Sequence, residues 1–96
     1  MKYKPRPGIV MTRICDMYVL IPAREAYNAC RAIRMLPFLW AATWELLVKE
    51  TPEDKIIRVH RILTKKTDED IRESIDRFCA DMTSVGFMIE EPQEKS

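Results

Sequence analysis

Glycine is scarce in this 96-residue chain, which has two glycines, one histidine and three cysteines. A loop that cradles phosphate through backbone N–H groups needs several glycines in one short stretch, and the sequence has no such stretch. It also lacks a Walker loop, an H-E-x-x-H pair and a nucleophile elbow. The composition therefore favours a binding protein over an enzyme, and we expect no cofactor.

The residues that most often bind metals or react as nucleophiles are few and badly spaced. The number of cysteines is odd, and no two of the three, Cys15, Cys30 and Cys79, have C-x₂₋₄-C spacing. This argues against a zinc site and against a disulfide framework, so we expect reduced cysteines. His60 has no Cys, Asp or Glu at an obvious ligand or triad spacing. We therefore expect it to be a solvent-side or half-buried helix residue.

Long hydrophobic runs are also missing. No apolar run approaches the roughly 20 residues that span a bilayer, and the basic start MKYKPRPG is followed by no signal-peptide core. This predicts a cytoplasmic protein that makes no contact with membranes. A chain of this length forms one domain. We expect a flexible arm at 1–8, the domain at 9–91 and a disordered tail at 92–96.

Three strand-like segments come before three helix-like segments. The strands are predicted at 9–15, 18–22 and 29–36, and the helices at 37–48, 51–63 and 67–85. This order predicts an α+β fold in which a three-stranded antiparallel sheet is followed by three helices, as in a winged helix-turn-helix. Pro37 is expected at the first helical position, and Thr51 and Thr67 are expected as N-caps. The second helix is expected to bury Ile56, Val59, Ile62 and Leu63.

Charge is distributed unevenly although the net charge is only +1. Residues 1–36 carry seven Lys/Arg and two Asp/Glu, whereas residues 68–96 carry three and nine. A recognition helix for nucleic acid needs clustered Lys/Arg to contact phosphates, and the predicted helix at 68–85 has net charge −4. An alternative function in nucleic-acid binding or transcription regulation then depends on the basic residues Lys55, Arg58, Arg61, Lys65 and Lys66.

The third predicted strand, ACRAIRML at 29–36, would lie at the edge of the sheet because sequential strands tend to be neighbours. An edge strand leaves a row of backbone N–H and C=O groups unpaired. An extended peptide could add there as a fourth strand, and Arg31 and Arg34 would favour an acidic one. The alternatives are an edge covered by the chain itself and a homodimer paired through the edge.

Three stretches carry a family resemblance: RAIRMLPFLWAATWELL, TPEDKII and DEDIRESIDRFCADMTSVGFMIEE. Their shared features are a strand ending in Leu36, the helix end WELL at 44–47, the capped TPED at 51–54 and the glycine stop within 82–89. This pattern resembles the PqqD-like family of peptide-binding domains, also called RiPP recognition elements. The chain departs from the family at Leu36-Pro37, where Leu-Asn is common.

The resemblance implies a non-catalytic domain that binds the leader of a ribosomally made precursor peptide. From its length of 96 residues we expect it to be free-standing. Such domains present the peptide to a modifying enzyme, often a radical S-adenosylmethionine (radical SAM) protein and sometimes a cyclase or protease. We expect a monomer or an edge-paired homodimer and no nucleic-acid partner. The ladder would come from Cys30, Arg31, Ala32, Ile33, Arg34 and Met35. The groove would be floored by Ile71, Ile75 and Phe78 and flanked by Ser74.

Two points about this groove stay open from the sequence. Ile71, Ile75 and Phe78 could equally be plain core residues. The last helix also has a second flank, with Asp68, Arg72 and Cys79, and the sequence does not decide which flank faces the peptide.

Overall fold

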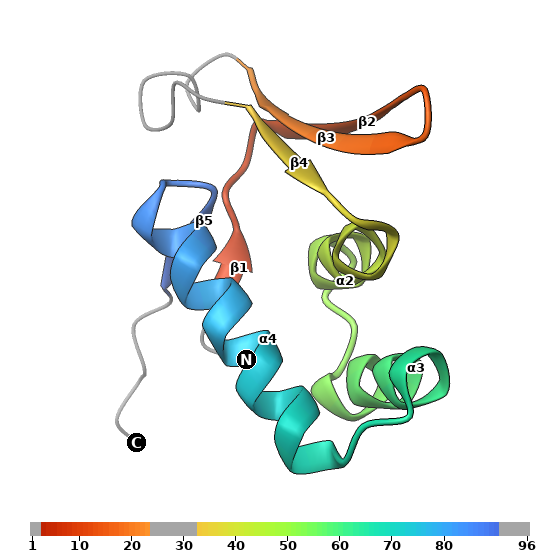
Figure 1. Cartoon of the computed structure of the whole chain (residues 1–96). Helices are drawn as coiled ribbons and strands as arrows, with labels where there is room; N and C mark the ends of the chain where they lie inside the picture. The colour runs from red at the N-terminus through yellow and green to blue at the C-terminus, as the bar shows by residue number, and fades with distance from the viewer. Residues whose placement is uncertain (1–2, 24–32, 91–96) are drawn as a thin grey trace, which may run out of the picture.

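The structure is a computed structural model that describes residues 3–23 and 33–90. It confirms the predicted α+β fold, with a three-stranded antiparallel sheet followed by three helices (Figure 1). The described elements, in chain order, are β1 (Tyr3–Pro5), β2 (Ile9–Ile14), β3 (Met17–Pro22), β4 (Arg34–Leu36), α2 (Phe38–Val48), α3 (Glu53–Thr64), α4 (Asp68–Ser84) and β5 (Met88–Glu90).

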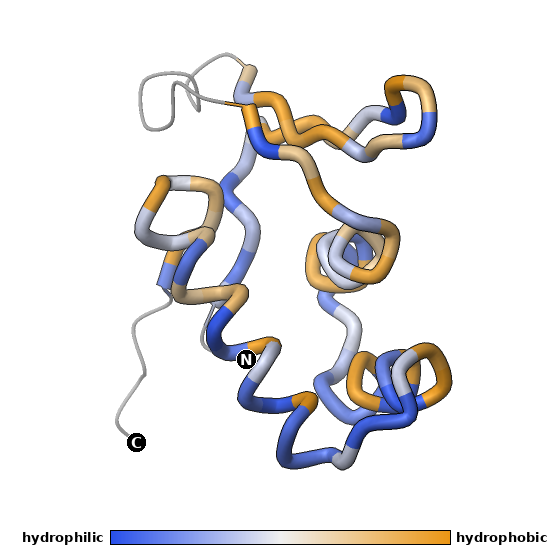
Figure 2. Tube along the Cα trace, in the orientation of Figure 1, coloured by the Kyte–Doolittle hydropathy of each residue, from blue (hydrophilic) through white to orange (hydrophobic). Residues whose placement is uncertain are grey.

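The sheet has the order β2-β3-β4, with both pairs antiparallel. Met11 lies opposite Leu20 and Tyr18 lies opposite Leu36, so these side chains share one face of the sheet. Leu20 is fully buried on that face and belongs to the core. Figure 2 shows apolar residues along much of the β2–β3 hairpin, whereas the first half of α4 is mainly hydrophilic.

The helix starts differ from the sequence prediction at two prolines. Pro37 and Pro52 are the N-caps of α2 and α3, with extended ψ angles of 162° and 146°, and neither helix has a side-chain cap. Pro37 therefore precedes the first helical residue, and the predicted cap at Thr51 is wrong. Proline suits this place because its missing N–H leaves no donor to satisfy. Thr67 is confirmed as the cap of α4, and its Oγ1 accepts the Asp70 N–H at 3.2 Å.

The core lies between the helix-facing side of the sheet and the three helices. Its largest fully buried side chains include Trp44 from α2, Ile56 from α3, Ile75 from α4 and Phe87 from the segment after α4. Cys79 is also fully buried, and burial raises the pKa of its thiol to about 12. Cys79 is therefore a small buried hydrophobe and an unreactive thiol.

The expected loose arm over residues 1–8 is partly wrong, because β1 pairs antiparallel with β5. Two further bonds continue this contact: the Arg6 N–H donates to the Phe87 carbonyl at 2.9 Å, and its Nε donates to the Gly86 carbonyl at 2.6 Å. Gly86 has a φ of 91°, which a residue with a Cβ adopts at a cost, and it turns the chain from α4 into β5. The two ends of the domain are thus joined. No helix in the described part of the chain is long and apolar enough to cross a membrane.

Candidate functional site

The edge of β4 is the first part of the candidate site. Within the described residues β4 pairs with β3 and with no other strand. Backbone groups alternate in direction along a strand, so one bond fixes which groups face which neighbour. The Ala23 N–H donates to the Gly8 carbonyl at 2.8 Å, which turns the backbone groups of Val19 and Ile21 toward β2. The backbone N–H and C=O of Leu20 must then face β4.

The same alternation fixes the direction in which the backbone groups of β4 point. Leu20 lies opposite Arg34, so the Arg34 N–H and C=O face β3. The N–H and C=O of Met35 must point the other way, toward the open edge. Met35 therefore presents one donor and one acceptor there, placed as an added strand would need them.

The side chains along this edge differ between the two faces of the sheet. Ile33 and Met35 are 60% and 59% exposed, and Met35 lies on the face that points away from the helices. Arg34 shares the helix-facing side with Leu20 and Leu36. It is exposed, and no carboxylate among the described residues forms an ion pair with it. The edge thus combines apolar contact on one face with a free positive charge on the other.

A small pocket forms the second part of the site. Its volume is about 210 Å³, and it is lined by Trp40, Ser74, Arg77, Phe78 and Asp81. The rings of Trp40 and Phe78 stack with centroids 4.7 Å apart and planes at 16°. Trp40 follows the end of β4 by four residues, most of them in the first turn of α2, which puts it within roughly 10 Å of the edge. About three residues of an extended peptide would bridge that distance.

The buried side chain of His60 packs against the Trp40 ring and is hydrogen-bonded to Thr43. The Trp40 ring meets the His60 ring edge-on, with centroids 5.1 Å apart. The Thr43 Oγ1 donates to the Leu39 carbonyl at 2.8 Å, so it accepts from the His60 Nε2 at 2.6 Å. His60 is only 2% exposed, which corrects the expectation of a solvent-side or half-buried residue. Burial, followed by the charge of Lys66, lowers the pKa of His60 from its ordinary 6.5.

The predicted site residues fall into four groups. Arg34 and Met35 lie at the edge, Ile33 immediately precedes β4 and is not part of it, and Ser74 and Phe78 line the pocket. Ile71 and Ile75 are each 1% exposed and belong to the core, so their side chains offer no surface to a peptide. Cys30, Arg31 and Ala32 lie outside the described residues.

Of the two flanks of α4, the one with Ser74 borders the pocket. On the other flank, Cys79 is buried, and the Arg72 Nε lies 3.7 Å from the Glu53 Oε1 in an ion pair. Trp40 also lines the pocket and is a site residue that the sequence analysis did not name. The available signal was its position next to the i, i+3 series of Phe38, Ala41, Trp44 and Leu47.

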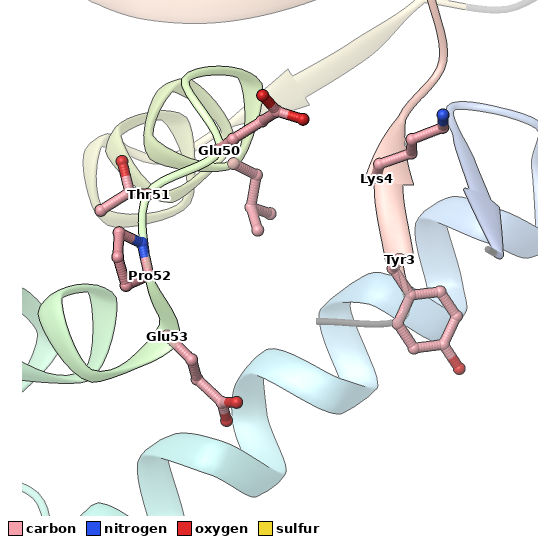
Figure 3. Close-up of a pocket in the computed structure, with 7 residues that line it drawn as sticks. Tyr3, Lys4, Glu50, Thr51, Pro52 and Glu53 are labelled. Carbon is pink, nitrogen blue, oxygen red and sulfur yellow. The ribbon is translucent and has the colours of Figure 1, made fainter. Parts of the chain in front are cut away.

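A second pocket of about 210 Å³ lies between β1 and the connection from α2 to α3 (Figure 3). Tyr3 and Lys4 come from one side, and Glu50 and Glu53 come from the other. Figure 3 shows the polar ends of these four side chains pointing in different directions. They therefore do not converge on a common ligand position, and we assign this pocket no chemistry.

The described residues, 3–23 and 33–90, contain no cluster of His, Cys, Asp and Glu that could hold a metal ion. Comparisons with protein-family models, with curated proteins and with solved structures found no match to this chain. The β4 edge and the Trp40–Phe78 pocket are therefore the two features of the described residues from which we infer a function.

Proposed function

We propose that this chain binds an extended peptide as a fourth strand on β4. The observation that carries the proposal is the direction of the Met35 N–H and C=O, which point to an edge that no described strand occupies. Main-chain hydrogen bonds to such an edge give affinity that depends little on sequence, and neighbouring side-chain pockets add specificity. The Trp40–Phe78 pocket is close enough to take an apolar side chain of the same peptide.

The charge and apolar surface at the edge suggest the composition of the peptide. Side chains of an added strand alternate between the two faces of the sheet. Those on the helix-facing side pass Arg34, which favours Asp or Glu. Those on the outer side pass Met35, which favours apolar residues. The bound segment is therefore an alternating acidic and apolar strand.

The resemblance to RiPP recognition elements suggests the biological source of this peptide. In that role the chain is a cytoplasmic, non-catalytic peptide chaperone that holds the leader of a ribosomally made precursor. A modifying enzyme, such as a radical SAM protein, then acts on the part of the precursor that follows the leader. The acidic α4 disfavours the alternative of nucleic-acid binding, since Asp68, Glu69 and Asp70 begin that helix.

A proline substitution tests the strand-addition step. Met35→Pro removes the outward N–H and leaves the ladder to β3 intact, so the fold should survive. The probe is a fluorescein-labelled extended peptide of alternating acidic and apolar residues, which stands for the leader, and anisotropy gives its Kd. We expect affinity to fall by up to about ten-fold, since a net hydrogen bond contributes up to about 1.5 kcal/mol.

The matched control is Arg13→Pro, which removes an outward N–H from β2 at the opposite edge of the sheet. Its leader affinity should equal that of the wild type. Helical circular dichroism and urea midpoints verify that both variants fold. A folded Met35→Pro variant with unchanged affinity would mean that the peptide docks elsewhere.

A further inference from the structure

The sheet has a second open edge, at β2, with a different pocket beneath it. The alternation that turns Val10 and Thr12 toward β3 points the backbone groups of Met11 and Arg13 away from the sheet. Within residues 3–23 and 33–90, no strand other than β3 pairs with β2. Beneath this end of the sheet lies a pocket of about 230 Å³ lined by Met11, Tyr18, Phe38, Ala41, Ala42 and Glu45.

The lining of this pocket fits a cation with an apolar stem. The rings of Tyr18 and Phe38 lie with centroids 6.2 Å apart and planes at 57°, and Phe38 is 60% exposed. Aromatic faces attract Lys and Arg side chains through their quadrupoles. Glu45 is exposed at the rim, and no cation in the described part of the chain pairs with it. The pocket is thus apolar at its base and negative at its mouth.

The size of the pocket argues for a side chain and against a free small molecule. Sites for small ligands usually measure about 300–1,000 Å³, and this one is smaller. A strand added to β2 would place the residue opposite Met11 on the same face as Met11, because paired residues share a face. That face borders the pocket.

Arg13 lies on the same face as Met11, but its guanidinium already contacts the turn between β2 and β3. Its Nε donates to the Cys15 carbonyl at 3.1 Å, and its Nη2 lies 3.6 Å from Asp16. Arg13 is therefore directed toward the turn and away from the mouth of the pocket. Glu45 is the charged residue among those that line the pocket, so its carboxylate is available to an incoming side chain.

We propose that β2 and this pocket form a second docking surface, for a protein segment that adds as a strand and inserts one Lys or Arg side chain beside Glu45. Its preference is opposite in sign to that of the β4 edge, where Arg34 favours acidic residues. The two surfaces lie at opposite edges of one sheet, so two different partners can be bound at once. This inference is independent of the leader-binding proposal, because neither β4 nor the Trp40–Phe78 pocket takes part.

The test uses two synthetic peptides, acetyl-TVRVT-amide and the neutral acetyl-TVQVT-amide, titrated into ¹⁵N-labelled protein. We expect amide shifts centred on Met11, Tyr18, Phe38 and Ala42, and a Kd for the arginine peptide about five-fold or more lower than for the glutamine peptide. An exposed ion pair and a cation–π contact can each lower the Kd by up to roughly five-fold. Added salt should reduce the difference.

Glu45→Gln should remove most of the preference for arginine, whereas the control Glu69→Gln, an exposed carboxylate on α4, should leave it unchanged. Both substitutions are at exposed positions, so both variants should fold. Equal Kd values for the two peptides with the wild type would overturn the proposal. So would shifts centred on residues 34–36, or the absence of any shift at millimolar peptide.

Discussion

The stability of this domain should fall between pH 7.5 and pH 5.5 because of a single residue, His60. It is the only histidine in the chain, and it is 2% exposed with its Nε2 bonded to Thr43. Burial and the charge of Lys66 lower its pKa in the folded state, whereas the unfolded chain titrates near 6.5. Below that value the unfolded state binds more protons, so the free energy of unfolding decreases as the pH falls.

The magnitude of this effect is bounded by the one proton involved. A difference of one bound proton changes the free energy of unfolding by about 1.4 kcal/mol per pH unit, so the slope approaches but does not exceed this value. His60 should contribute no pH dependence above about pH 7.5, where both states carry a neutral imidazole. Most Asp and Glu side chains titrate near pH 4, so the window from 5.5 to 7.5 isolates the histidine.

Urea unfolding at pH 7.5, 6.5 and 5.5 measures the effect, with His60→Gln as the control. The glutamine amide can still donate to the Thr43 hydroxyl, but it takes up no proton in this range. The wild type should lose stability on acidification, and the variant should show a nearly flat profile. Identical slopes for the two proteins would refute the reasoning, as would a wild type whose unfolding free energy stays constant down to pH 5.5.

Three more predictions concern the Thr43 hydroxyl, the charge of Arg34 and the acidic start of α4. Thr43→Val removes the acceptor of the buried His60 N–H, so urea unfolding at pH 7.5 should show a loss of about 1–3 kcal/mol, and a loss below 0.5 kcal/mol would contradict the hydrogen bond. Arg34→Ala should weaken leader binding by up to about five-fold if the arginine forms an exposed ion pair, and calorimetry in added salt should shrink that difference, whereas a salt-independent loss would count against an ion pair. Duplex DNA should bind no more tightly than the roughly 10⁻⁶ M limit of non-specific association at physiological salt, and a tighter anisotropy titration would favour the nucleic-acid function.

Local signals in the sequence were enough to predict most of the fold. The proline and threonine positions marked the helix starts to within a residue, and Gly86 marked the end of α4. The pairing of β1 with β5 was missed because it joins segments more than eighty residues apart, and YKP at 3–5 has no strand-like pattern. Such pairing depends on the tertiary arrangement, which brings Arg6 beside Gly86 and Phe87.

The buried face of α3 was predicted correctly at Ile56 but wrongly at its second half, which left His60 out of the core. The periodicity favoured Ile62 and Leu63, which are 70% and 50% exposed, whereas the helix buries Ile56, Ile57 and His60. Hydropathy ranks histidine as polar, so the pattern turns His60 outward. In the structure Thr43 supplies its hydrogen-bond partner, which removes most of the cost of burying it.

The candidate site was predictable only in part. An open edge follows from the order of the strands, and Arg34 and Met35 could be placed on it. The sequence did not show which backbone groups point outward, because that depends on the register with β3. Nor did it separate Phe78, which lines a pocket, from Ile71 and Ile75, which lie in the core two turns and one turn earlier.

Amide hydrogen exchange at two adjacent residues of β4 tests strand addition most directly. The Arg34 N–H faces β3, and the Met35 N–H faces the open edge. When the leader peptide is added at saturation, NMR should show strong new protection of the Met35 amide and little change at Arg34. A Met35 amide that exchanges equally fast with and without bound peptide would contradict the account.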